Sequence, residues 1–213
     1  MAPGVNYVAR YAVVVSEPES LRERTRRAVQ GELVDVAQQL FVDRGYEHTT
    51  VDAIASAAGM SKRSFFRYFA SKEELVLGKY DLMGDQLVAR LDARPDDEPL
   101  WTALRRMFDD VVAYTANSAN AARMGEMERI VTTTPALRGG YLQRFEAMQK
   151  DIAEVVRRRA ERAGSPFAPE DPSPAAIVGA AFACLSAART ASATGGQPYE
   201  DAVDAAMRAV AAL

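Results

Sequence analysis

The stretch from Thr49 to Lys72 reads TTVDAIASAAGMSKRSFFRYFASK, and it decides the fold of this protein. Its first apolar residues recur at the i, i+3, i+4, i+7 spacing of one helix face: Val51, Ile54, Ala55 and Ala58. Gly59 follows, where a helix C-terminus favours a residue that tolerates positive φ. Ser61 is suited to cap a second helix, on which Phe65 and Phe69 face inward. The pattern predicts a short helix, a tight turn and a second helix.

The predicted second helix leaves polar, cationic and aromatic side chains on its outer face: Lys62, Arg63, Ser64, Phe66, Arg67 and Tyr68. Helix-turn-helix domains are built in this way, with the second helix entering the major groove of DNA. On this pattern alone, an ordinary helical corner explains the stretch equally well.

A longer string around this stretch resembles the TetR family of transcriptional regulators: LVDVAQQLFVDRGYEHTTVDAIASAAGMSKRSFFRYFASKEEL. The matching landmarks are Ala37, Leu40, Phe41, Gly45, Tyr46, Thr49, Thr50, Val51, Ile54, Ala55, Gly59, Ser61, Phe65, Tyr68, Phe69, Lys72, Glu73 and Leu75. The resemblance is dense from about Arg24 to Leu75. It implies an all-α fold, in which an N-terminal three-helix helix-turn-helix DNA-binding domain precedes a helical ligand-binding and dimerisation domain.

The resemblance and the composition together predict three parts in the 213 residues. Residues 1–20 contain Pro, Gly and Glu, and we expect a disordered extension; alternatively, the apolar YAVVV patch within it adds a strand or packs on a neighbour. Residues 21–72 are the expected DNA-binding domain. Residues 73–213 are the expected ligand-binding and dimerisation domain.

Charge is distributed unevenly along the chain, whose net charge is −3. Residues 22–72 hold nine Lys and Arg against six Asp and Glu, whereas residues 73–213 hold 16 against 21. An acidic body repels DNA, so only the helix-turn-helix end is expected to approach it. Four arginines crowd the start of the helix predicted over Leu21–Arg44, where positive charge opposes the helix dipole: Arg22, Arg24, Arg26 and Arg27. Phosphate partners and a solvated basic end are equally good explanations.

The rest of the chain is predicted to be helical. The expected helices span Ser71–Leu91, Leu100–Asn117, Ala119–Val131, Pro135 to a solvated run at Arg157–Arg159, Ser173–Thr194 and Pro198–Ala212. The last two are rich in Ala, so they bury little apolar area alone and need a closely approaching partner. In the family, the corresponding helices form a homodimer interface, with Ala188 and Val203 expected in the seam.

The resemblance implies which residues contact double-stranded DNA: Thr50, Ser61, Lys62, Arg63, Ser64, Phe66, Arg67, Tyr68 and Lys72. Lys62 and Arg63 can reach guanine edges or phosphates. Phe66 departs from the family's usual Tyr and lacks the hydroxyl that would donate to a phosphate. This departure, together with the acidic body, leaves a second hypothesis open. It is a helical small-molecule-binding or protein-interaction module that does not bind DNA.

Methionine and aromatic side chains in the body are candidates for an effector pocket: Trp101, Phe108, Met124, Met127, Tyr141, Phe145 and Met148. Plain core packing explains such residues as well. The segment WTALRRMFDD…ERIVTTTPALRGGYLQRFEAM is similar to the C-terminal domain of mycofactocin regulators, which implies an acyl-CoA-like effector. Four cations could then meet its phosphates: Arg123, Arg129, Arg138 and Arg144.

Catalytic, cofactor and membrane functions are not indicated. The single histidine, His48, and the single cysteine, Cys184, form no credible triad, and no Gly-rich phosphate loop is present. No metal-ligand spacing occurs, so we expect no metal and no cofactor. No apolar run approaches the ~20 residues that span a bilayer, and Val5–Val15 does not read as a signal peptide. We therefore expect a cytoplasmic regulator that is released by a small apolar or amphipathic effector.

Overall fold

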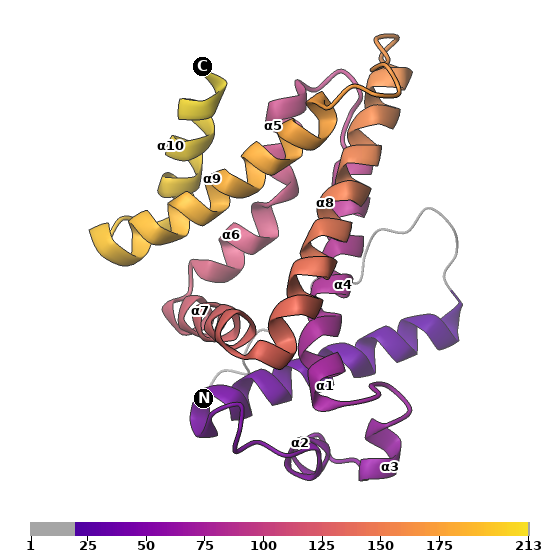
Figure 1. Cartoon of the computed structure of the whole chain (residues 1–213), viewed down its shortest axis with the longest axis vertical. Coiled ribbons are helices and arrows are strands. Elements are labelled where there is room, and N and C mark those ends of the chain that lie inside the picture. The colour runs from indigo at the N-terminus through magenta and orange to yellow at the C-terminus, as the bar shows by residue number, and fades with distance from the viewer. Residues whose placement is uncertain (1–19, 213) are drawn as a thin grey trace. The chain divides into compact units, whose positions relative to one another are not determined.

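The computed structural model describes residues 20–212, and over these residues the only regular secondary structure is helical (Figure 1). The expectations for the N-terminal extension therefore lie outside the described residues, apart from Ser20. The helices are α1 Leu21–Arg44, α2 Val51–Ala57, α3 Lys62–Phe65, α4 Lys72–Asp92, α5 Leu100–Met107, α6 Asp109–Thr115, α7 Ser118–Thr133, α8 Pro135–Arg162, α9 Ser173–Gly195 and α10 Tyr199–Ala211. The all-α prediction is confirmed.

Two compact units divide the described chain. We call the first the reading unit; it comprises residues 20–83 and 122–145. The second, the body unit, comprises residues 84–121 and 146–212. The reading unit thus holds the predicted DNA-binding segment together with the start of α4, most of α7 and the start of α8. Both α4 and α8 pass from one unit into the other along the chain.

The core of the reading unit joins the helix-turn-helix to α1 and to the start of α4. Phe41, Ile54, Phe65 and Leu137 are fully buried, and Leu75 is almost fully buried in the same cluster. These residues come from α1, α2, α3, α4 and α8, in that order. The inward positions predicted from the helical period are therefore the positions that hold the short α2 and α3 in place.

Helix α8 lies directly against α4 within the reading unit. Arg144 donates to Glu74 at 2.9 Å and to Asp81 at 3.0 Å, both on α4. A Cβ built at Gly140 would lie 2.6 Å from the Leu77 side chain, so only glycine fits this approach without a shift. The glycine that weakens the start of α8 therefore serves a helix crossing.

In the body unit, α10 packs against α9, α5 and α6. Trp101 donates from its indole N–H to the carbonyl of Met207 at 2.8 Å, which joins α5 to α10. Phe108 and Phe182 meet edge to face, with ring centroids 5.3 Å apart. Gly196 ends α9 at a φ of 67°, and the chain then turns into α10.

The prediction of one continuous helix over Leu100–Asn117 is wrong. It is divided into α5 and α6 at Phe108, whose backbone lies at φ −91° and ψ 2°. Phe108 is fully buried against Phe182, so its side chain fixes the position of the break. Helical periodicity continues across such a break, which is why the sequence pattern did not reveal it.

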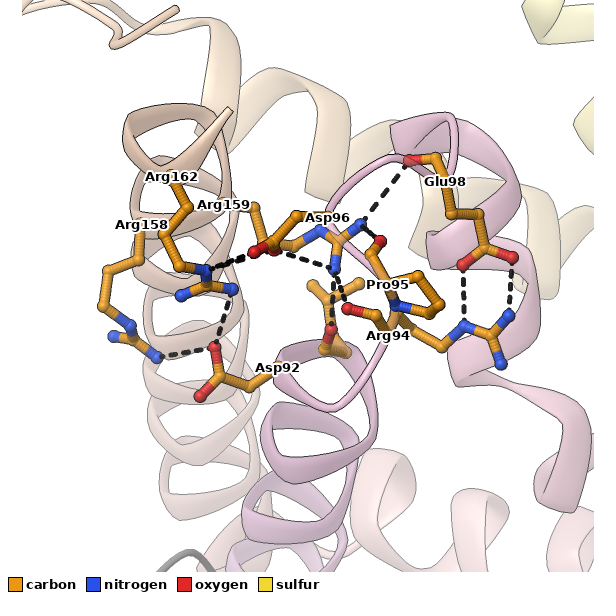
Figure 2. Close-up of polar contacts among 9 residues, drawn as sticks. Asp92, Arg94, Pro95, Asp96, Glu98, Arg158, Arg159 and Arg162 are labelled. Carbon is orange, nitrogen blue, oxygen red and sulfur yellow. Dashed lines mark hydrogen bonds and ion pairs between the residues drawn. The ribbon is translucent and has the colours of Figure 1, made fainter. Parts of the chain in front are cut away.

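The expected solvated run Arg157–Arg159 is also wrong at Arg159, which is buried with only 4% of its surface exposed. Figure 2 shows its guanidinium among backbone oxygens at the end of α4, where it donates to the carbonyls of Arg94 and Pro95, both at 2.7 Å. Longer contacts reach the carbonyls of Leu91 at 3.4 Å and Glu98 at 3.5 Å. Helix α4 ends at Asp92, so Arg159 mainly donates to the loop that follows α4 and reaches the last turn of the helix only through the Leu91 carbonyl.

By length and composition alone, α9 could cross a membrane, which differs from our expectation from the sequence. Nine of the 23 residues of this helix are alanine, which counts as apolar but provides little area for packing. Alanine-rich helices that meet a protein partner satisfy the same test, and α9 packs against α10 within the body unit. The composition therefore does not by itself indicate a membrane segment.

Candidate nucleic-acid interface

Two hydroxyl groups start the two short helices of the helix-turn-helix. Thr50 Oγ1 accepts a hydrogen bond from the Ala53 amide at 3.1 Å and thereby caps α2. Ser61 Oγ accepts from the Ser64 amide at 3.1 Å and caps α3. Between the helices, Gly59 takes a φ of 68°. Thr50 and Ser61 therefore have a structural role in addition to the DNA contacts predicted for them.

The outer surface of α3 and the turn that follows presents the predicted contact residues. Lys62, Arg63, Phe66 and Arg67 are exposed, and Phe66 leaves 48% of its surface accessible. Phe65 is fully buried beneath them and meets the Phe66 ring edge to face, with centroids 5.5 Å apart. The structure therefore brings cations and one flat aromatic ring together on one exposed surface.

Asp52 on α2 is a neighbour of this surface that sequence reasoning missed. Its carboxylate lies 2.8 Å from Lys62 Nζ, and both side chains are exposed, at 64% and 54%. An exposed ion pair of this kind is worth about 0–1 kcal/mol, so Lys62 can exchange Asp52 for a phosphate or a guanine at little cost. The ten-residue separation in sequence gave no signal of this pair.

Lys72, at the start of α4, is tied inward to the loop before α2. Its ammonium donates to the carbonyl of Tyr46 at 2.8 Å and to that of Thr49 at 3.1 Å, and it lies 4.0 Å from the centre of the Tyr46 ring. Tyr46 donates in turn to Glu73 at 3.0 Å, and burial raises the pKa of its hydroxyl. Lys72 therefore fixes the loop that leads to Thr50, and its contact with DNA stays a prediction.

We call the exposed surface of Lys62, Arg63, Phe66 and Arg67 the reading surface. Tyr68 follows it in the chain and is tied to α1. Gln30 on α1 donates from its side-chain amide to the Tyr68 carbonyl at 3.3 Å. The Arg67 guanidinium lies over the Tyr68 ring, 6.0 Å from its centre. The hydrogen bond from Gln30 joins the C-terminal end of the helix-turn-helix to the long helix α1.

A partly buried polar cluster lies in the reading unit, where charges from three helices interact. Burial raises the pKa of Asp35 on α1 to about 6, against the opposing charges of Arg123 on α7 and Lys79 on α4. Burial lowers the pKa of Lys79 to about 8. Arg123 also donates to Gln39 at 2.8 Å, which joins α7 to α1. This cluster ties α4 and α7 to the helix beneath the reading surface.

The residues predicted to line an effector pocket are divided between the two units. Met124, Met127, Tyr141 and Phe145 belong to the reading unit, and Trp101, Phe108 and Met148 belong to the body unit. Phe108, Met127 and Met148 are buried, while the others are partly exposed. The Tyr141 ring lies tilted against the Phe145 ring, with centroids 5.9 Å apart. It meets the Tyr80 ring edge to face, with centroids 4.9 Å apart. Their role as a pocket lining stays a prediction.

Three of the four arginines proposed for the pocket mouth already have protein partners. Arg123 binds Gln39, Arg129 forms a two-bonded pair with Glu126, and Arg144 binds Glu74 and Asp81. Arg138 instead lines an open depression of about 440 Å³ at the α7–α8 corner, with Thr132, Thr133, Pro135, Gly139 and Leu142. Among residues 20–212, no group of three or more His, Cys, Asp or Glu is arranged to hold a metal ion.

Comparison with known proteins identifies the family. Residues 33–78 match the bacterial regulatory proteins of the tetR family, and residues 98–213 match the MftR C-terminal domain. The chain belongs to the TetR family. Its N-terminal helix-turn-helix and helical C-terminal part are those of a TetR-family transcriptional regulator, and both resemblances stated from the sequence are confirmed.

Similar TetR-family proteins are regulators. The chain is 36% identical over 143 residues to the regulator TcmR of Streptomyces glaucescens, covering 65% of this chain and 63% of TcmR. It is 30% identical over 152 residues to MftR of Mycobacterium tuberculosis, named for mycofactocin biosynthesis. This match covers 71% of this chain and 76% of MftR. It is 34% identical over 128 residues to the repressor KstR2 of the same species. This match covers 60% of this chain and 48% of KstR2.

Solved structures of TetR-family proteins share this fold. One is FadR of Bacillus halodurans, titled a fatty acid degradation regulator, with a TM-score of 0.59 at 17% identity, covering 84% of this chain and 93% of FadR. At this identity the likeness shows the fold alone. Because its relatives are transcription regulators, which are not enzymes, this TetR-family protein is assigned as a transcriptional regulator without catalytic activity.

Proposed function

We propose that this TetR-family protein is a repressor that binds a near-palindromic operator as a homodimer in the cytoplasm. The observation that supports it is the exposed α3 surface, where Lys62, Arg63 and Arg67 surround Phe66 above the fully buried Phe65. Helices of this kind read base edges in the major groove through their N-terminal residues. In a dimer, two such helices contact half-sites about 34–36 Å apart.

The dimer is proposed to form through α9 and α10, as in the family. Four alanines on these helices are exposed in the single chain: Ala183, Ala187, Ala205 and Ala209. Each pair is spaced by four residues and lies on one helix face. Small residues allow two helix backbones to approach closely, so these faces are suited to a second copy of the chain.

The effector is proposed to be a small apolar or amphipathic molecule, with acyl-CoAs as the first candidates. The similarity of residues 98–213 to the MftR C-terminal domain supports a search for the effector site in this part of the chain. A bound effector weakens operator binding only if it binds one shape of the protein better than the other. Coupling of about 1–3 kcal/mol, roughly 5–150-fold in affinity, is typical. Unchanged operator affinity across acyl-CoAs of increasing chain length would exclude this ligand class.

Selection of binding sites from a random duplex pool tests the DNA-binding part of the proposal. We expect a near-palindrome to emerge, and Lys62→Ala to lower affinity for it by about tenfold or more. Lys150→Ala is the matched control, because Lys150 is an exposed lysine of α8 in the body unit.

Equal affinity of the wild type for selected and scrambled duplexes would contradict sequence-specific binding. In that case, the alternative of a helical module without DNA binding would stand. Equal losses from Lys62→Ala and Lys150→Ala would instead show that the selected site is read by net charge and not by α3.

A further inference from the structure

The first two turns of α1 form an exposed basic segment, which is not part of the reading surface on α3. Every residue from Leu21 to Ala28 is exposed, and Leu21 leaves 72% of its surface accessible. Within the described chain, no hydrogen bond or ion pair holds the side chain of Arg22, Arg24 or Arg26, and the Arg24 backbone amide makes only the helix-start bond to the Ser20 carbonyl. Packing usually stabilises a protein helix, and here no burial supports these turns.

The segment is nonetheless a regular helix. Ser20 and Glu23 form a capping box: the Ser20 hydroxyl accepts from the Glu23 amide at 3.3 Å, and the Ser20 amide donates to the Glu23 carboxylate at 3.0 Å. Glu23 is therefore engaged with its own cap, and hydrogen bonds from Ser20 lower its pKa. The cap fixes the directions in which the arginines leave the helix.

The angular position of each arginine around the axis of α1 can be given relative to Gln30. The Gln30 side chain donates to the carbonyl of Tyr68, next to the reading surface. A turn of 100° per residue places Arg26 about 40° and Arg22 about 80° from Gln30, both on the same side of α1. Arg24 lies about 120° away on the other side, opposite to the Arg22–Arg26 pair. At 1.5 Å per residue, Arg26 and Arg22 lie about 6 and 12 Å further along α1 than Gln30. In the view of Figure 1, this end of α1 lies to the right of α3 and above it.

We propose that Arg22 and Arg26 form a second DNA contact, binding phosphates of the duplex beside the groove that α3 reads. This inference rests on the proposed function and extends its binding site along α1. Two guanidiniums a helical turn apart, with no side-chain partner among residues 20–212, suit successive phosphate groups. They read no base, so they strengthen binding to any sequence. The unfavourable placement of cations at a helix N-terminus is explained by the anionic partner.

The test uses the full-length protein, the selected duplex and a scrambled duplex, with affinity measured against salt concentration. In Arg22→Gln/Arg26→Gln, we expect weaker binding to both duplexes by the same factor. The slope of log affinity against log salt should become shallower by about 0.9 for each lost contact, or up to about 3.6 for the four arginines of a dimer. Arg24→Gln, the matched control, should keep the wild-type slope. All variants should melt at the wild-type temperature.

Three results would overturn the inference or its basis. An unchanged slope in the double variant, with wild-type binding intact, would show that Arg22 and Arg26 are a solvated basic end. An equal flattening in Arg24→Gln would show a diffuse charge effect without a defined contact. Failure of the wild type to bind either duplex would remove the proposed function and this inference with it.

Discussion

At the scale of the residue, Gly59 is a position where backbone conformation, and not the space available, decides the choice of amino acid. Its φ is 68°, and a Cβ built there meets no atom within 4 Å. Space is therefore not the constraint. A side chain in this left-handed region is strained by contact with its own backbone, by roughly 1–2 kcal/mol. The turn between α2 and α3 depends on this glycine.

We predict that Gly59→Ala lowers the free energy of unfolding by about 1 kcal/mol. Gly125→Ala is the control, because Gly125 lies within α7, a Cβ there also meets nothing within 4 Å, and its φ is not positive. That change should stabilise the protein by about 0.5–1 kcal/mol, since alanine favours helices. Chemical denaturation of the two variants measures both signs. A stabilising Gly59→Ala would contradict the assigned turn.

At the scale of the element, the end of α4 depends on one arginine of α8. Arg159 provides donors for carbonyls in and after the last turn of α4, and it is shielded from water (Figure 2). Around it, Arg162 pairs with Asp96 at 3.0 Å and Arg158 approaches Asp92 at 3.8 Å. The buried and exposed arginines of one helical turn therefore differ in what they contribute.

We predict that Arg159→Gln lowers the free energy of unfolding by about 3 kcal/mol, because the hydrogen bonds from a buried charged donor to several backbone carbonyls are lost. Arg158→Gln, its exposed neighbour with a single long ion pair, should change it by less than about 0.5 kcal/mol. Thermal or urea unfolding of both variants compares them directly. Similar effects for the two would mean that the carbonyl contacts contribute little.

At the scale of the whole molecule, the proposed dimer determines whether two reading surfaces bind one operator. Ala188 and Val203, expected in the seam, leave 1% and 0% of their surface exposed within the single chain. They pack inside the body unit, so an arginine there would unfold it and reveal nothing about assembly. Ala187, one residue along α9, is exposed and provides the discriminating position.

We predict that Ala187→Arg gives a folded monomer with at least tenfold weaker operator binding, because an unpaired charge enters a close helix contact. Ala147→Arg, at an exposed alanine of α8, should remain dimeric. Light scattering gives the mass, and circular dichroism shows that both variants are folded. A monomeric wild type at micromolar concentration, or a dimeric Ala187→Arg, would exclude this interface.

Local sequence determined much of the reading unit. The caps at Thr50 and Ser61, the positive φ of Gly59 and the inward Phe65 follow from preferences that act over three or four residues. The bounds of α1 were predicted as observed, and Gly45 marks its C-terminal end, whereas the capping box of Ser20 with Glu23 was not predicted and Ser20 had been assigned to the extension. Such signals are short-range, so they can be read without knowing what packs on the helix.

Only the tertiary structure decided which charged residues are buried and what they bind. Arg159 looked like one member of a solvated run, and its partners lie more than 60 residues away in the chain. The pairing of Lys62 with Asp52, the inward turn of Lys72 and the break at Phe108 likewise depend on other elements. Residue type records that a side chain is charged or apolar, whereas burial and partner are set by helices that meet only when the chain folds.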